Sequence, residues 1–236
     1  MYKYNLITMK RTDFYFCLIV VALFAPFVLS PNLYAGYQSF NAEHGMVMSF
    51  LKFAVLSTLG ELLGLRISTG QYLRKGFGVL PRAVVWGVLG MGINLAFIVF
   101  STGVPAAAGY LGVADPAAIM AGPVTLGKVL LAFAISVSLN SIFAPVFMTF
   151  HKITDTHILA TGGTLRGLFT PIPMGDIMKN LNWQVQWNFV FKKTIPFFWF
   201  PAHTITFLLP GEMRVLFAAL LGVALGVILA VAARKK

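Results

Sequence analysis

The sequence predicts an all-α protein, a single-domain polytopic bundle of about six transmembrane helices with both termini in the cytoplasm. Composition is the first observation: of 236 residues, 58% are hydrophobic and 11% charged, whereas a soluble domain averages roughly 45–50% apolar and 25% charged residues. The mean hydropathy of +0.82 is the second. The third is that fifteen of the eighteen Lys and Arg residues fall in four clusters, separated by pairs of apolar segments. Together these observations predict an integral membrane protein.

The four basic clusters predict the topology. Their members are Lys3, Lys10 and Arg11; Arg66, Arg74, Lys75 and Arg82; Lys152, Arg166, Lys179, Lys192 and Lys193; and Arg234, Lys235 and Lys236. The connectors on the other side, at 31–45, 104–122 and 210–212, contain no Lys or Arg. Because Lys and Arg accumulate on the cytoplasmic side of membrane proteins, the clusters predict that side. With six spans, both chain ends lie there.

Six apolar segments follow one another along the chain. They are Phe14–Leu29, Met46–Leu65, Arg82–Thr102, Val124–Phe150, Thr194–Leu209 and Val215–Ala233. A membrane-crossing helix needs about 17–25 residues, which the second, third and sixth segments provide. The fourth is long enough to tilt, and Pro145 predicts a kink in it because proline removes one backbone donor. The first and fifth have sixteen residues each, and the aromatic stretch 187–191 can extend the fifth backwards.

The first segment allows a second interpretation. Lys10 and Arg11 precede a sixteen-residue apolar run, as in a secretory signal peptide. However, residues 33–35 match a small-x-small cleavage site poorly, and Pro26 lies within the run. We therefore expect an uncleaved first helix.

The longest connection, His151–Lys193, is expected on the cytoplasmic side. Near its end, Trp183 and Trp187 lie four residues apart and are followed by Lys192 and Lys193, so that both indoles share one face if 176–193 is helical. This pattern is typical of a helix in the head-group layer, and equally of an aromatic belt at the start of the fifth span. The sequence leaves both interpretations open.

Polar side chains inside the predicted spans are the candidate functional residues, since such groups are costly in hydrocarbon and usually face the bundle interior or a wet cavity. Three cations, Lys52, Lys128 and Arg214, lie in the outer third of their helices. In one interpretation each cation reaches the head groups or pairs with a nearby acid. In the other, the three converge in a basic vestibule like those of anion pores.

A second group of polar residues lies deeper in the spans. Asn94, Asn140 and His203 fall near the midplane, where they either join helices by hydrogen bonds or line a hydrated path. Glu61 and Arg82 lie on the two arms of one inner hairpin at similar depth, which predicts an ion pair. With the outer cations, these residues outline a candidate substrate path.

Small residues recur at the spacing of close helix packing. Gly60 and Gly64 form one such pair, and Ala218, Gly222, Gly226 and Ala230 form a stripe along the last segment. Such stripes join helices within a monomer or across a homo-oligomer, and the sequence does not decide between these arrangements.

Catalytic signatures are weak, and we expect no enzyme, no cofactor and no catalytic residue. His151, Asp155 and His157 have a spacing that suits a metal ion. Because they begin a water-exposed loop without a further acid cluster, we expect no metal site, and a lipid-modifying enzyme would rest on these three residues alone. The formal charge of +11 is explained by attraction to anionic head groups. Membrane lipids, rather than nucleic acid, are therefore the expected partners, together with a small-molecule or anion substrate.

The last three segments contain a recognisable order of residues. Asn140 precedes Phe143-Ala144-Pro145, and Phe198-Trp199-Phe200-Pro201 is followed by Phe207, Pro210 and Arg214. This order resembles the twenty-two-kilodalton peroxisomal membrane protein family, which has a mitochondrial inner-membrane member, over roughly 46–233. Gly60-Glu61 stands where that family has Gly-Asp. The chain departs from the family at Leu139, which replaces an acid, in a third segment without the His and Trp-Tyr signature, and in a last segment without the closing Trp.

The resemblance implies a distant prokaryotic relative in an inner (plasma) membrane, and a channel-like or transport-modulating protein. It further implies pore-like roles for Glu61, Asn140, Trp199, Pro201 and Arg214, with Pro145 as part of the motif.

The predicted function is a channel or transporter that passes small solutes or anions through a polar helix-bundle core. The predicted path runs from Lys52, Lys128 and Arg214 through Asn94, Asn140 and His203 towards Glu61 and Arg82. The alternative is a non-transporting scaffold or assembly factor that recruits a partner through the loop 151–193.

Overall fold

The computed structural model describes residues 9–233, and every regular element in this range is a helix. The elements are α1 (Arg11–Leu29), α2 (Pro31–Glu43), α3 (Gly45–Thr69), α4 (Val79–Tyr110), α5 (Pro116–Ala121), α6 (Leu126–Ala160), α7 (Leu165–Leu168), α8 (Met174–Asn180), α9 (Trp183–Val185), the π-helix η1 (Gln186–Trp199), α10 (Phe200–Leu208) and α11 (Gly211–Ala233). The predicted all-α class is confirmed.

Five helices within the described range are long and apolar enough to cross a membrane, namely α1, α3, α4, α6 and α11. They fit an integral, multi-pass membrane protein. The fifth predicted segment is divided between η1 and the nine-residue helix α10. Six crossings and cytoplasmic termini therefore stay predictions, and Lys3 and the basic cluster at 234–236 lie outside the described residues.

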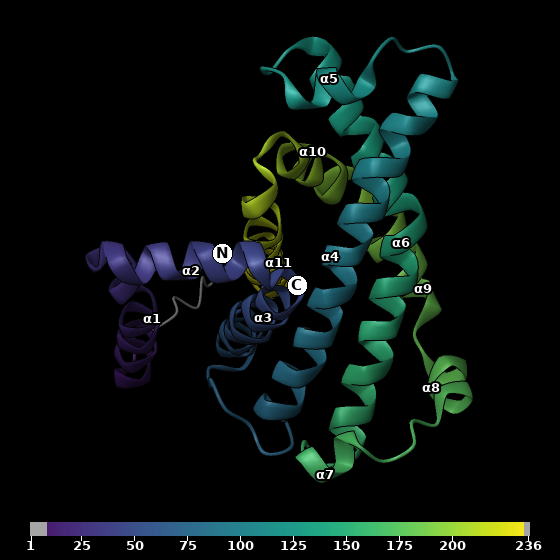
Figure 1. Ribbon diagram of the computed structural model, residues 1–236. Helices are drawn as coiled ribbons and strands as arrows, with labels where there is room; N and C mark the ends of the chain where they lie inside the picture. Colours follow the sequence, from purple (N-terminus) through teal and green to yellow (C-terminus); the bar gives the residue numbers. More distant parts are fainter. Residues whose placement is uncertain (1–8, 234–236) are drawn as a thin grey trace, which may run out of the picture.

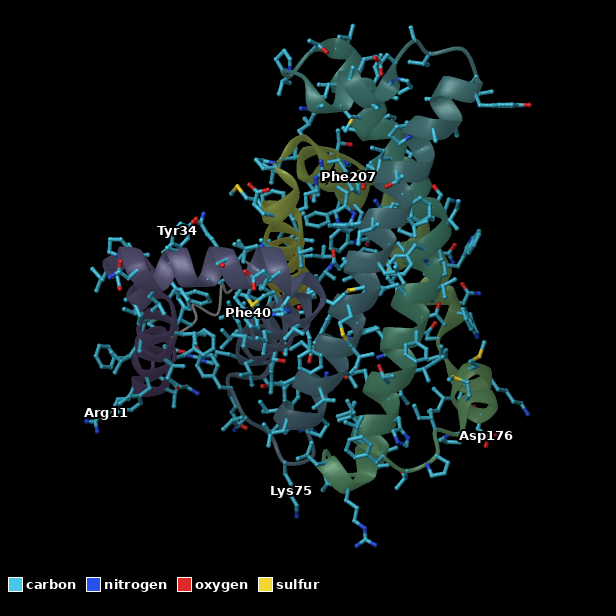
Figure 2. All side chains as sticks on the ribbon, viewed as in Figure 1. Arg11, Tyr34, Phe40, Lys75, Asp176 and Phe207 are labelled. Atoms are coloured by element: carbon cyan, nitrogen blue, oxygen red, sulfur yellow. The ribbon has the colours of Figure 1, made fainter. Side chains whose placement is uncertain are left out.

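The basic connections gather at one end of the bundle. The loop 70–78 between α3 and α4 lies at the same end as α7, opposite α5 (Figure 1). Arg11 and Lys75 both project at this end (Figure 2). Parts of three basic clusters thus lie at one end of the bundle, and the side of the membrane that this end faces stays a prediction.

Several helices extend beyond the apolar segments that predict them. Helix α4 continues to Tyr110, and α6 continues through Pro145 to Ala160. The predicted loop 151–193 is therefore too long at both ends, because 151–160 belong to α6 and 186–193 to η1. The side chains of His151 and Asp155 contact Glu61 and Arg82, so that these turns of α6 gain tertiary contacts as well as backbone hydrogen bonds.

A single head-group helix over 176–193 is wrong. Helix α8 ends at Asn180, and Leu181 has an extended backbone. From Trp183 the chain is helical to Leu208 through α9, η1 and α10. The aromatic stretch 187–191 thus continues into the fifth segment as helix. This agrees with the prediction that this stretch extends the fifth segment backwards.

The core forms where α3, α4, α6, α10 and α11 meet. Its fully buried side chains include Ile135, Leu139 and Phe207. Gly226 of the small-residue stripe of α11 packs against α3 within the chain: a Cβ added there would lie 3.9 Å from the Gly60 carbonyl oxygen, and one added at Gly60 would lie 3.1 Å from the Cα of neighbouring Val223. The close-packing role of the stripe is thereby placed inside the monomer.

Two glycine-rich loops meet at the α7 end. Gly78, before α4, and Gly163, after α6, both have positive φ, 74° and 68°. A Cβ at Gly163 would lie 2.6 Å from the Gly78 backbone N. Only glycine allows this approach, and the two loops are therefore in direct backbone contact.

Helix α1 stands largely exposed and is tied to the α7 end by Asp13. The carboxylate accepts two hydrogen bonds of 2.6 Å from Arg66 of α3. Next to this pair, Phe16 stacks on Tyr72 at 4.5 Å. Burial, with the hydrogen bond to Asp13, raises the pKa of Tyr72 to about 12. At neutral pH the phenol is thus held as a neutral donor.

Candidate functional site

A cavity of about 380 Å³ lies inside the bundle, lined by α3, α4, α6, η1, α10 and α11. This volume falls within the range of small-molecule pockets. The lining extends along α3 from Phe53 to Gly64 and along α6 from Leu139 to Lys152. At 1.5 Å per helical residue the cavity is roughly 16–20 Å long. It is a long, narrow space parallel to the main helices.

The π-helix η1 forms one wall. Gln186, Val190, Thr194 and Trp199 line the cavity, spaced four or five residues apart. Bonding of each N–H to the carbonyl five residues earlier gives a π-helix roughly 4.4 residues per turn, which aligns these four side chains on one face. In an α-helix Gln186, Val190 and Thr194 would still share a face, but Trp199 would point to the opposite side. The uncommon helix type thus brings two amide or hydroxyl groups and an indole to the cavity.

Charged groups occupy the end of the cavity nearest α7. Arg82 donates from Nη1 to Glu61 Oε2 at 2.7 Å and pairs through Nη2 with Asp155. Glu61 Oε1 also lies 3.3 Å from His151 Nε2, and Lys152 Nζ lies 3.8 Å from Asp155. The predicted ion pair between Glu61 and Arg82 is confirmed, and Figure 2 shows the side chains of this end of the bundle. Each carboxylate has at least one cation beside it.

The midplane end of the cavity holds a buried polar pair. Asn140 and His203 Nδ1 are 3.0 Å apart, and Asn140 Nδ2 also donates to the Ser136 carbonyl at 2.8 Å. The ring of Trp199 lies 4.9 Å from that of His203. Two of the predicted midplane residues are therefore neighbours, and both line the cavity.

Three buried donors on the lining have no hydrogen-bond partner among the described residues. They are Ser57 Oγ, Trp86 Nε1 and Trp199 Nε1. Ser57 is only 4% exposed. Native structures pair nearly all buried polar groups; each of these three atoms has almost no accessible surface, so protein atoms enclose it although its residue lines the cavity.

The three outer cations do not line the cavity. Lys52 donates from Nζ to Asn41 of α2, Lys128 donates to the Gly122 carbonyl at the end of α5, and Arg214 donates to the Leu209 and Phe207 carbonyls at the end of α10. Each satisfies a group close to its own helix, as in the local-pairing interpretation. The converging vestibule stays a prediction that these contacts do not support.

Three further predicted residues also lie outside the cavity lining. Asn94 Nδ2 is 3.5 Å from Met46 Sδ on α3. Pro145 lies within α6, and Pro201 is exposed near the start of α10. Of the predicted path and motif residues, the cavity collects Glu61, Asn140, Trp199 and His203, while Arg82 lies behind Glu61.

The His-Asp-His spacing after Phe150 does not form a metal site. His157 Nε2 lies 3.0 Å from the Gly167 carbonyl, whereas His151 and Asp155 face Glu61 and Arg82. Within residues 9–233 no three His, Cys, Asp or Glu side chains are placed to hold a metal ion.

Trp86, Gln186 and Thr194 are cavity residues that the sequence interpretation missed. Trp86 lies in the middle of an apolar run and reads as a core aromatic, yet its ring is 4.4 Å from that of His151. Gln186 and Thr194 are eight residues apart and would share a face of an α-helix too, but only the π-helix places Trp199 on that face with them. The polar residues Gln186 and Asn188 between aromatic neighbours were the one available signal.

Comparison with protein-family models, with curated proteins and with solved structures found no match to this chain.

Proposed function

We propose that this membrane protein passes a small solute through the core of its helix bundle, as a channel or transporter. The observation that carries the proposal is the elongated cavity, which extends from the Glu61 and His151 pair to the Asn140 and His203 pair. A space with polar groups at both ends and apolar walls between them suits a small solute that keeps polar contacts at the two ends while its remaining surface is removed from water. The resemblance to the twenty-two-kilodalton peroxisomal membrane proteins likewise implies a pore-like role for Trp199, which lines this cavity.

The anion version of this function has less support. Rings of Lys or Arg attract anions when they face a pore, but Lys52, Lys128 and Arg214 each satisfy a local acceptor away from the cavity. We therefore propose uncharged solutes as the first class to test, with anion conductance as the comparison.

The test uses purified protein in liposomes and a single cavity-filling variant. A Cβ at Gly222 meets nothing within 4 Å, and Gly222 lines the cavity. Gly222→Leu should therefore narrow the cavity without a backbone clash. Gly103→Leu, at an exposed glycine of α4 with equal free space, is the matched control.

We expect solute-driven liposome swelling that Gly222→Leu reduces several-fold and Gly103→Leu leaves unchanged. Swelling equal to that of empty liposomes, for neutral solutes of increasing size and without anion current, would exclude passage. An anion current reduced by Lys128→Gln would instead restore the anion version.

The scaffold alternative is supported by exposed aromatic residues between α6 and η1. The side chain of Phe169 is 79% exposed and that of Trp183 is 41% exposed. Affinity purification with the full chain and with 164–180 replaced by a Gly-Ser linker separates the two functions. A scaffold loses its partners with the segment, while a transporter keeps its flux.

A further inference from the structure

We propose that the cavity opens sideways to the bilayer, between η1 and α11, and that acyl chains of membrane lipids occupy it. The inference adds to the proposed function the phase from which the cavity is filled, and it does not depend on transport. Two observations lead to it: the order in which the surrounding helices pack, and the chemistry of the surface that the cavity presents.

The helices around the cavity form a ring that is interrupted at one place. Helix α11 packs along α3, α3 along α4, α4 along α6, and α6 against η1. Helix α10 closes one end of the ring, where it contacts α6, η1 and α11. Among the described residues η1 and α11 do not pack along each other, although both line the cavity. The wall of the cavity is therefore open between these two helices, opposite α4.

The two helices that flank the opening belong to different sides of the bundle. In Figure 1, α11 lies on the α3 side, and α9, which leads into η1, lies on the α6 side. They meet only where α10 connects η1 to α11. The opening can thus extend along the helices below α10.

This opening lies at the depth of the membrane hydrocarbon. The residues of α11 that line the cavity run from Ala218 to Leu229, the central turns of a helix of 23 residues that is apolar enough to cross a membrane. The central part of such a helix lies in the hydrocarbon core. The exposed side chains within this stretch are all apolar, namely Leu220, Ala224, Ile228 and Leu229. The opening therefore faces lipid chains rather than water.

The surface that the cavity presents is mostly apolar. Phe53, Phe143 and Leu225 are among its walls. Trp86 Nε1 and Trp199 Nε1 have almost no accessible surface, so that these indoles present ring carbon to the cavity. A hydrocarbon chain therefore meets apolar surface along these walls, whereas a charged group would lose its water there without a new partner.

The charged residues at the α7 end of the cavity are already paired. Glu61 faces Arg82 and His151, and Asp155 faces Arg82 and Lys152. Because each charge has a partner, an uncharged chain can fill the cavity without leaving a buried charge uncompensated.

Trp86 is the reporter for the test, because it comes from α4 and therefore lies across the cavity from the opening. The chain has four tryptophans, and the W183F/W187F/W199F protein keeps Trp86 alone. Bromine and iodide both quench indole fluorescence on contact. The protein is placed in nanodiscs of phosphatidylcholine with brominated acyl chains, or in nanodiscs of the unbrominated lipid with iodide in the water. The two quenchers thus report the two phases separately.

We expect strong quenching of Trp86 by the brominated chains and little quenching by iodide. Gly222→Leu should reduce the lipid quenching several-fold. Gly222 lines the cavity from α11, and a Cβ there meets nothing within 4 Å, so that leucine takes the space of a chain. Gly103→Leu, at an exposed glycine with equal free space, is the matched control and should leave the quenching unchanged.

Three results would overturn the inference. Quenching by iodide that equals or exceeds quenching by the brominated chains would show that the cavity fills from water. No quenching by either would show that it is closed, and lipid quenching that Gly222→Leu leaves unchanged would refute the opening at α11.

The comparison of quenchers is repeated on the W183F/W187F protein, which keeps Trp199 and has no change in the cavity lining. A poorly folded cavity variant therefore does not affect it. Lipid quenching without solute flux would refute the proposed function alone, and flux without lipid quenching would refute only this inference.

Discussion

Arg82→Gln should destabilise the protein strongly, and far more than the removal of an exposed charge at the α7 end. The guanidinium is 6% exposed and contacts four groups: Glu61, Asp155, the Phe77 carbonyl at 2.7 Å and the Phe77 ring at 4.2 Å. Glutamine is shorter and neutral. The substitution therefore leaves two carboxylates without their shared cation, in a place where water reaches them poorly.

The size of the effect follows from burial. Removing one partner of a buried ion pair costs about 3–5 kcal/mol. The Glu61 and Asp155 side chains keep 18% and 17% exposure, so partial hydration places the cost near the lower limit, about 3 kcal/mol. For a chain of this length, about 3 kcal/mol corresponds to a fall in Tm of about 6–12 °C.

The assay is thermal unfolding of purified protein in one detergent, followed by tryptophan fluorescence. Lys75→Gln, an exposed cation in the neighbouring loop, is the control and should change Tm by about 1 °C or less. Arg82→Gln combined with Asp155→Asn should recover part of the loss, because one of the two unpaired carboxylates is gone. A fall in Tm for Arg82→Gln no larger than that for Lys75→Gln would refute the reasoning.

Three further predictions concern packing, the midplane pair and the anchor of α1. Gly60→Ala should lower stability by about 1–3 kcal/mol, because its Cβ meets the Val223 backbone at 3.1 Å; Gly103→Ala, with open space around it, is the comparison in the same unfolding assay, and equal Tm values would contradict close packing. Asn140→Ala should cost about 1–3 kcal/mol, since it leaves buried His203 without its 3.0 Å partner, whereas Asn94→Ala should have little effect; comparable losses at the two sites would argue against the pair. In an alkaline absorbance titration, the difference between the wild-type protein and Tyr72→Phe should show a phenol with a pKa of about 12 rather than 10.0. Because the folded chain holds this proton more tightly than the unfolded chain, stability is full below pH 10.0 and declines as the pH rises to about 12; a midpoint near 10.0 would show that Tyr72 is not buried beside Asp13.

Much of the fold could be predicted from the chain because hydrophobic length and charge sorting are local properties. The helices α3, α4 and α11 and the small-residue stripe on α11 follow from such patterns, whereas the packing of that stripe against α3 within the chain does not. The division of the fifth segment does not. The chain changes from π- to α-helical bonding between Trp199 and Phe200, and apolar composition alone gives the same signal for one straight helix as for η1 followed by α10.

The candidate site was predicted only in part, for a similar reason. Asn140, His203 and Glu61 stand out because polar groups are rare in apolar segments. Lys52, Lys128 and Arg214 stand out equally, but their partners are amide or carbonyl groups five to eleven residues away in the sequence. Long side chains can turn to either side of a helix, and the sequence does not say which way they turn.

The backbone contact between Gly78 and Gly163 has a mechanical consequence. It holds the loop before α4 against the loop after α6. The ion pair between Arg82 of α4 and Asp155 of α6 connects the same two helices a short distance away. We therefore expect α3, α4 and α6 to move together. We expect the motion that admits or releases a solute to occur in η1, α10 and α11, because neither of these two contacts involves that wall of the cavity.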